Sequence, residues 1–380
     1  MKHIDPLHRT GDPVLLLNNN DVSSLLTMPM CIESIESVFD EIARSDAVGM
    51  GRIDMYVPSD GANAPFHRWS IMTGGSRRDG LVCARMLSDM VDWPSEYNKQ
   101  RETKYAKAPG TYCGLLFLYS VKDATPVAIM NDGALQHMRV GASAAIGVKH
   151  LARSNSHIVG MLGSGGMARA YLEAFSIVRE IRQVKVYSPN RDHALRYADE
   201  MTEKHGMDIT VLDSPREAVR GADIVSLCTS STEPVFKTEW LEPGMHIADV
   251  IPPETETSLR KNVDVAIRAG DYTARLKEMS QETFHASHTF LAYVAGQPEE
   301  KALIPHRPLR EDILTMPTLS DLLNGKAKGR TDDRQTTWFQ NLGSVGQQFE
   351  AVAAAVYRRA VESGKGMDLP TEWFLQNIRD

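Results

Sequence analysis

The residues with the clearest chemical meaning form a short glycine-rich loop, Gly163-Ser164-Gly165-Gly166-Met167-Ala168. An apolar strand is expected before this loop and an amphipathic helix after it. In that setting Gly163 permits a tight turn, Gly165 lets the backbone approach a pyrophosphate, and Ala168 allows close packing of helix on strand. The helix N-terminus then offers amide donors to the phosphates. The loop predicts a dinucleotide site; the alternative is a strand-to-helix turn that is glycine-rich for other reasons.

The end of the next expected strand indicates which dinucleotide is bound. An NAD site usually has Asp or Glu there, to hold the ribose 2′-hydroxyl. This chain instead reads Tyr187-Ser188-Pro189-Asn190-Arg191. Arg191 with Ser188 and Asn190 can bind a 2′-phosphate, which a carboxylate would repel. We therefore expect NADP(H) to be preferred over NAD(H), unless Arg191 is only a solvated residue at the start of a helix.

Composition limits the other possibilities. A chain of 380 residues with average apolar and charged fractions suits two globular domains. A net charge of −7 gives no general reason to bind nucleic acid. Four scattered cysteines form no CxxC pair, and no histidine spacing indicates a metal site. No apolar run approaches the roughly 20 residues of a membrane span, so we expect a cytoplasmic protein without a membrane or nucleic-acid partner.

The expected elements explain how these residues are positioned. Strands and helices alternate from residue 157 to residue 267, which is typical of a parallel, doubly wound sheet. Residues 49–127 contain short apolar runs typical of a mixed sheet, interrupted by a polar insertion at 92–109. Helices are expected at 18–45, 133–152 and 343–363.

Several stretches, in order along the chain, resemble the ornithine cyclodeaminase/mu-crystallin family. They comprise a strand pair, an arginine-bearing helix, the glycine loop, two later strands and a C-terminal signature, at residues 110–130, 135–145, 163–168, 228–247 and 321–360. The resemblance implies an α/β chain. A Rossmann NAD(P)-binding domain at 150–325 would be inserted into a mixed α+β substrate and dimerisation domain formed by 1–149 and 326–380.

The family resemblance also implies a reaction. Its members exchange hydride at a carbon that bears nitrogen. We therefore expect an NAD(P)H-dependent homodimer that reduces an imino acid or dehydrogenates an amino acid. The alternatives are a cyclodeaminase that recycles NAD and a non-catalytic, crystallin-like NADP(H)-binding protein.

Particular residues take roles from this resemblance. Arg52 and Arg139 correspond to arginines that hold the substrate carboxylate, and Met72 lies beside the substrate. Thr229 and Val250 are expected to contact the dinucleotide.

Two positions depart from the family pattern. Arg85 stands where the family has an acid/base lysine, and arginine is a poor proton shuttle at neutral pH. The family's catalytic aspartate after the fifth strand is missing at register, leaving Asp249 or Glu254 as substitutes. Both changes disfavour ring-forming cyclodeamination.

A last expectation concerns the substrate's charge. If Arg52, Arg68 and Arg85 converge on one face, with His67 nearby for proton transfer, the pocket would suit a dicarboxylic imino acid. The alternative is that Arg68 points to solvent or packs on Trp69.

Overall fold

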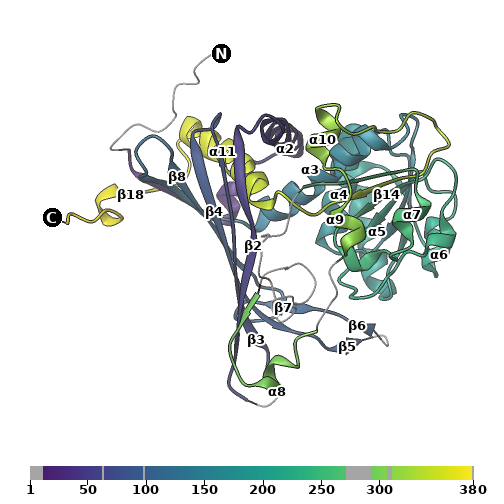
Figure 1. Cartoon of the computed structure of the whole chain (residues 1–380), viewed down its shortest axis with the longest axis horizontal. Coiled ribbons are helices and arrows are strands. Elements are labelled where there is room, and N and C mark those ends of the chain that lie inside the picture. Colours follow the sequence, from purple (N-terminus) through teal and green to yellow (C-terminus); the bar gives the residue numbers. More distant parts are fainter. Residues whose placement is uncertain (1–11, 62–63, 97–98, 271–291, 306–309, 379–380) are drawn as a thin grey trace.

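The computed structural model describes residues 12–61, 64–96, 99–270, 292–305 and 310–378. Two large sheets lie side by side, with helices between them (Figure 1). One sheet has long, mostly antiparallel strands, and the other is short-stranded and parallel.

The parallel sheet has the order β12-β11-β10-β13-β14-β17-β15. Its strands are β10 (Ile158–Leu162), β11 (Gln183–Tyr187), β12 (Asp208–Val211), β13 (Ile224–Leu227), β14 (His246–Asp249), β15 (Val265–Arg268) and β17 (Thr337–Gln340). The connecting helices include α4 (Gly166–Val178), α5 (Arg191–His205), α6 (Pro215–Val219), α7 (Leu259–Asn262) and α9 (Glu311–Leu314). Strands β13, β14 and β17 are buried on both faces, as expected of central parallel strands. The expected Rossmann fold is confirmed.

The long sheet has the order β16-β2-β3-β4-β8-β9-β1-β18, with β7 added to β4. Its strands are β1 (Val14–Leu17), β2 (Ala47–Pro58), β3 (Phe66–Ser76), β4 (Leu81–Asp92), β7 (Thr103–Tyr105), β8 (Cys113–Ser120), β9 (Pro126–Asn131), β16 (Ala292–Val294) and β18 (Met367–Leu369). Burial alternates strictly along β3 and β4, so each strand has an inner and an outer face. Strands β5 (Ser95–Glu96) and β6 (Lys99–Gln100) form a separate hairpin.

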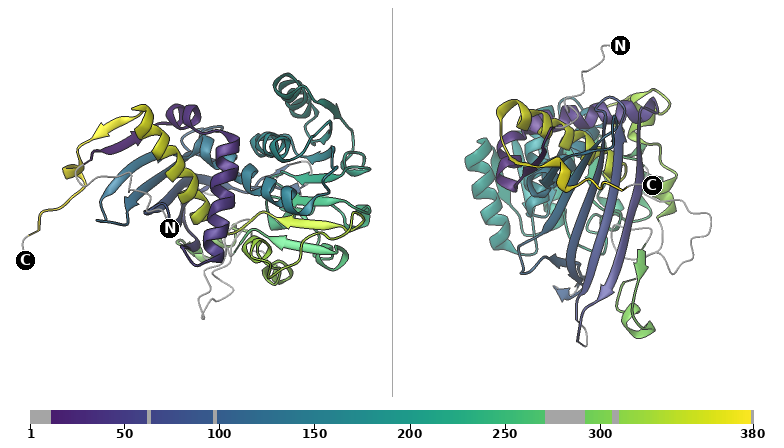
Figure 2. Two further views of the ribbon diagram at one scale, coloured as in Figure 1. Left: turned by 90° about the horizontal axis from the view of Figure 1, so that it is seen from above. Right: turned by 90° about the vertical axis from the view of Figure 1, so that its left-hand side faces the viewer.

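Helices cover the inner face of the long sheet and join it to the parallel sheet. They are α1 (Asn19–Leu25), α2 (Met28–Ala43), α3 (Gly133–Leu151), α10 (Leu319–Leu323) and α11 (Val345–Ser363). α11 packs on β3 and β4, and α3 packs on α2 and α4. Figure 2 shows α2 and α11 running next to one another over the sheet. A single apolar core therefore continues from one sheet to the other.

The single helix expected at 18–45 is in fact two helices, α1 and α2, bent by 86°. Pro29 lies in the first turn of α2, where its missing N–H costs nothing, and it cannot continue an earlier helix. Asn18 caps α1 through a capping box with Asp21. By length and composition, no single described helix could span a membrane; α1 and α2 pass that test only as a bent pair.

The boundaries between the two sheets differ from those expected. Strand β17 lies beyond residue 325 and yet completes the parallel sheet between β14 and β15. Strand β16 and helix α8 (Pro298–Lys301) lie before residue 325, but β16 pairs with β2 at the edge of the long sheet. The sequence pattern gave no sign of either crossing, because three- and four-residue strands carry little periodicity.

Candidate active site

The glycine loop connects β10 to α4 with the geometry expected of a pyrophosphate site. Gly163 has a φ of +102°, and a Cβ there would lie 2.2 Å from the carbonyl oxygen of Cys228. At Gly165, by contrast, a Cβ would meet no atom within 4 Å. Ala168, in the first turn of α4, is fully buried. The loop thus has glycine where β13 comes close and open space where a pyrophosphate would approach, so the residues present fit a dinucleotide.

Two side chains that the motif does not reveal shape this loop. Arg169 donates to the Ser164 carbonyl at 2.7 Å and to Glu200 on α5 at 2.6 Å, so it holds the loop against the neighbouring helix. His137 on α3 lies against Gly166, where a Cβ would stand 2.8 Å from Nε2. The imidazole of His137 therefore occupies the space that a side chain at position 166 would need.

The end of β11 is where the adenosine ribose binds in a Rossmann fold. Ser188 is half-buried there, and Arg191 is exposed and ion-paired with exposed Asp213. Asn190 has another task, because its side chain caps α5 by accepting from the His193 N–H at 3.1 Å. Its Oδ1 therefore has a structural role, and its contact with the cofactor stays a prediction.

The loops after β13 and β14 contain Thr229 and Val250, both half-buried. Glu254 joins them from η2 (Pro252–Glu254), accepting from the Thr229 N–H at 2.6 Å and the Val250 N–H at 2.9 Å. Burial raises the pKa of Glu254 to about 7, and these backbone donors oppose the rise. Since its oxygens are occupied by the protein's own donors, Glu254 is not a free acid facing a substrate.

Asp249 ends β14 and is fully enclosed. Burial, and then the nearby Glu254, raise its pKa well above the ordinary value. Its backbone carbonyl accepts from the Tyr171 hydroxyl at 3.4 Å, while the indole of Trp338 lies beside the carboxyl. The expectation that Asp249 transfers protons at the substrate is therefore unsupported, because a side chain without exposed surface does not reach one.

Arg85 lies on the inner face of the long sheet and is bound to Asp132 at the start of α3. Its Nε and Nη2 approach one carboxylate oxygen at 2.7 and 2.5 Å, and Nη1 lies 3.6 Å from the sulfur of Met72. Gly114 makes room for this pair, since a Cβ there would fall 2.1 Å from Asp132. Burial lowers the pKa of Arg85, and Asp132 opposes that shift. Arg85 is a fixed cation whose carboxylate partner belongs to the protein.

Arg139 reaches the same place from α3, but among the described residues it has no carboxylate within 4 Å. It donates to the amide oxygens of Gln348 at 3.3 Å and Gln136 at 3.1 Å. Both Arg139 and Arg85 stack on the ring of Phe349, at 4.6 and 4.7 Å from its centroid. Burial, and then the charge of Arg85, lower the pKa of Arg139 to about 9.

The close approach of α11 to β3 sets this arrangement. A Cβ on Gly74 or Gly346 would collide with the backbone of the other element, so the helix lies directly on the strand. This contact brings Phe349 to the two guanidinium groups. Asn341, just after β17, donates to the Val140 carbonyl and to the Tyr171 hydroxyl, which fixes α3 to the carboxyl end of the parallel sheet.

The other two arginines expected near the substrate, Arg52 and Arg68, pair with carboxylates of the protein. Arg52 pairs with Asp54 at 2.7 Å and donates to Ser70. Arg68, far from pointing to solvent, is buried between Asp89 at 2.7 Å and Glu102 at 3.1 Å. Arg52, Arg68 and Arg85 therefore lie near one another on the inner face, as expected, but each already has a carboxylate partner in the protein. A dicarboxylic substrate stays a prediction that this pairing disfavours.

His67 lies on the opposite face of the sheet from Arg68 and Arg85. Its Nε2 contacts the hydroxyl of Ser88 at 2.9 Å on the outer side. Neighbouring residues of a strand point to opposite faces, and the BiBi burial of β3 follows that rule. The assignment of His67 to proton transfer was therefore wrong, and alternation along 66–76 was the signal that could have excluded it.

Residues 92–109 were expected to be an exposed insertion, but Arg101 and Glu102 within this range contact both sheets. Glu102 is anchored by Arg68, and the backbone of Arg101 forms a bridge with Ser231 in the loop after β13. The segment therefore closes one side of the junction between the sheets.

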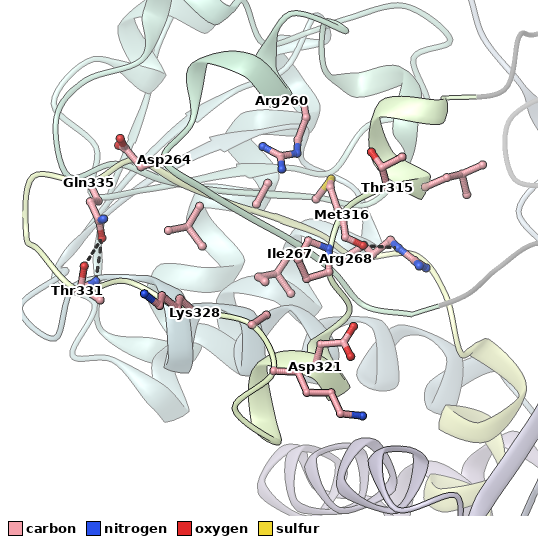
Figure 3. A pocket seen from close by; sticks show the side chains of 17 residues that line it. Arg260, Asp264, Ile267, Arg268, Thr315, Met316, Asp321, Lys328, Thr331 and Gln335 are labelled. Carbon is pink, nitrogen blue, oxygen red and sulfur yellow. Dashed lines mark hydrogen bonds between the residues drawn. The ribbon is translucent and has the colours of Figure 1, made fainter.

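A cavity of about 690 Å³ lies away from all these residues. Figure 3 shows it at the edge strand β15, where Arg260, Asp264, Arg268, Thr315, Asp321 and Lys328 line it. It contains none of the residues expected to bind substrate or cofactor. Within the part of the chain that the structure describes, no group of three or more His, Cys, Asp or Glu side chains could hold a metal ion.

Comparison with known proteins places the chain among enzymes of similar size. The model of the Ornithine cyclodeaminase/mu-crystallin family matches residues 95–364. The chain is 29% identical to the alanine dehydrogenase of Archaeoglobus fulgidus, over 93% of this chain and 97% of that protein. It is 27% identical to a Delta(1)-pyrroline-2-carboxylate reductase of Bacillus cereus, over 67% and 74%. The Delta(1)-pyrroline-2-carboxylate reductase of Thermococcus litoralis, solved in complex with NADH and L-proline, superimposes with a TM-score of 0.72 at 25% identity, covering 94% of this chain and 100% of that one.

Proposed function

The chain belongs to the ornithine cyclodeaminase/mu-crystallin family, and from that premise we propose that it is an NAD(P)H-dependent oxidoreductase that reduces an imino acid or dehydrogenates an amino acid. One observation carries the proposal. Arg139 is a buried guanidinium at the junction of the two sheets, and within the described part of the chain it is held by amide oxygens alone. A buried cation without an anion is costly, and a substrate carboxylate would supply that anion bidentately.

The dinucleotide supplies a hydride donor or acceptor, and the chain's own residues orient the substrate. Arg139 holds the carboxylate, which fixes the position of the adjacent carbon. Arg85 stays charged and bound to Asp132, so it contributes a positive field but no proton. An iminium ion arrives already protonated and needs no acid there. This arrangement favours imine reduction, or its reverse, over ring closure with loss of ammonia.

We infer a substrate with one carboxylate. Arg52, Arg68 and Arg85 each have a carboxylate partner in the protein, which leaves Arg139 for the ligand. The names of the two relatives, a pyrroline-2-carboxylate reductase and an alanine dehydrogenase, are consistent with this class.

We also propose that NADP(H) is preferred over NAD(H). No acidic side chain lies between Tyr187 and Arg191, and Arg191 is available because its pair with Asp213 is exposed. Such exposed pairs contribute about 0–1 kcal/mol, less than a contact with a phosphate.

A homodimer is proposed from the outer face of the long sheet, which none of the described helices covers. That face carries half-buried Trp69, Ile71, Met86 and Phe117, and more exposed Met55 and Tyr119. An apolar face of this extent is typical of an interface. Light scattering should give twice the chain mass, and Ile71→Glu should give the monomer, whereas Val361→Glu on the exposed side of α11 should not. A monomeric wild type contradicts the proposal.

The cytoplasmic location stays a prediction.

The experiment for the activity is a screen of NADPH and NADH oxidation against cyclic 2-imino acids and mixtures of 2-oxo acids with amines. The expected result is turnover with at least one imine, faster with NADPH, and a KM for that imine raised about 10- to 100-fold in Arg139→Met. Conversion of ornithine to proline and ammonia with catalytic NAD⁺, but no imine reduction, would instead identify a cyclodeaminase.

A further inference from the structure

Glu254 is a fully buried acidic side chain with an unusual set of partners. Its Oε1 accepts from the N–H and the hydroxyl of Thr229 at 2.6 and 2.8 Å. Its Oε2 accepts from the N–H groups of Val250 and Ile251 at 2.9 and 3.0 Å. One carboxylate therefore satisfies three backbone amides and a hydroxyl from two separate loops.

These two loops follow β13 and β14, at the carboxyl edge of the parallel sheet. In a doubly wound fold the dinucleotide lies along this edge. The first loop also contacts the phosphate loop, because the carbonyl of Cys228 is the group that excludes a side chain at Gly163. Glu254 thus sits behind the surface on which the dinucleotide would lie, and it does not face that surface itself.

We propose that Glu254 is a positioning residue for dinucleotide binding, its carboxylate holding the loops at Thr229 and Val250 in the conformation that accepts the cofactor. The inference rests on the proposed function and goes beyond it, because it assigns cofactor affinity to a residue that does not touch the cofactor.

Only the ionised carboxylate can accept all four hydrogen bonds. A protonated acid turns one oxygen into a donor, which then faces an N–H group and must lose that contact. We call Glu254 and its donors at Thr229, Val250 and Ile251 the carboxylate clamp. Because the pKa of Glu254 is raised to about 7 by burial, the clamp keeps all four hydrogen bonds above neutral pH and loses part of them below it. NADH affinity is therefore expected to fall as the pH decreases through neutrality.

The neighbouring groups do not compete for this titration. Burial raises the pKa of Asp249, Tyr171 and Cys228 well above their ordinary values, which opposes the ionisation of each. Arg310 donates to the carbonyls of Pro252 and Thr255. His137 lies beside Gly166 in the phosphate loop.

The test is the dissociation constant of NADH, measured by fluorescence from about pH 6 to about pH 8.5. NADH is the probe because it lacks the 2′-phosphate of NADPH, which itself titrates near pH 6. The wild type should bind up to about tenfold more weakly for each pH unit below the midpoint. Glu254→Gln should bind at least about tenfold more weakly above neutral pH, because its amide nitrogen faces two N–H groups. Its pH dependence should also disappear.

The control is Glu256→Gln, two residues away, where the carboxylate accepts from Thr238 N–H at the surface. It should leave both the affinity and the pH profile unchanged. If Glu254→Gln fails to fold, Thr229→Val removes one donor to the carboxylate and should move the midpoint of the profile to higher pH.

The outcomes separate the inference from the function on which it rests. If the wild type binds NADH and Glu254→Gln keeps its affinity and slope, or the midpoint of Thr229→Val is unmoved, the clamp is refuted while the proposed function stands. If the wild type binds neither NADH nor NADPH at any pH, the proposed function itself has failed.

Discussion

Replacing Arg139 with methionine separates a binding arginine from a structural one. The pKa of Arg139 is lowered from 12.5 to about 9, mainly by burial, which corresponds to a cost of about 5 kcal/mol for keeping the charge in the folded protein at neutral pH. Methionine has a similar length and no charge, so Arg139→Met removes this cost and leaves a small loss of packing. The free energy of unfolding should therefore not fall. Substrate affinity should fall, because a charge-assisted hydrogen bond to a carboxylate contributes about 1.5–3 kcal/mol.

The assay is the KM for the best imine of the screen, together with urea unfolding of the apoprotein. Arg139→Met should raise KM about 10- to 100-fold without lowering stability. Arg68→Met is the matched comparison, because that arginine is paired with Asp89 and Glu102. It should destabilise the fold by about 3–5 kcal/mol, since it removes the buried cation that pairs with the buried carboxylate of Asp89. The reasoning is refuted if Arg139→Met unfolds as easily as Arg68→Met, or if it binds substrate normally.

Substitutions at three further positions test other parts of the account. Arg191→Ala should weaken NADPH binding about 10- to 100-fold and leave NADH nearly unchanged in a fluorescence titration; equal effects would contradict the assignment of the 2′-phosphate. For Arg85, alanine should lower kcat/KM for imine reduction because Asp132 loses its partner, and lysine should retain more activity; an unchanged alanine variant would show that Arg85 is only structural. Glu350 on α11 has no hydrogen-bond partner among the described residues, and burial followed by the charges of Asp79 and Glu41 raises its pKa well above 4.5. An acid whose pKa is raised in the folded state stabilises the fold below its unfolded pKa and loses that contribution as pH increases. Glu350→Gln should therefore be more stable than the wild type at pH 8 in urea. The same stability at pH 5 and pH 8 for both proteins would contradict this.

The sequence was informative where local geometry determines the residue. Gly163 and Gly165 could be assigned because a positive φ and an open approach demand glycine, and the order of strands and helices predicted the parallel sheet. It was harder to predict which face of a strand a given side chain occupies. His67 and Arg68 are neighbours in sequence yet lie on opposite faces of β3, so alternation should have been applied before the two were grouped.

The partners of the charged residues could not be read from the sequence. Asp132 is separated by 47 residues from Arg85, and Gln348 by 209 from Arg139. Such pairs depend on how α3 and α11 cross the long sheet. The neutralisation of Arg68 by Glu102 was missed for the same reason, because 92–109 was expected to face solvent. Glu254 was considered as an acid, but the four donors that occupy it come from loops brought together only by parallel pairing of β13 and β14.

The most direct test of hydride exchange at a carbon bearing nitrogen uses NADPH labelled with deuterium at C4 of the nicotinamide. The enzyme would be supplied with the best imine of the screen, and the amino acid product would be examined by mass spectrometry and NMR. The account predicts one deuterium per product molecule, bonded to the carbon that carries the amino group, with one NADPH consumed for each. Product without deuterium, or formed without net consumption of NADPH, would contradict it.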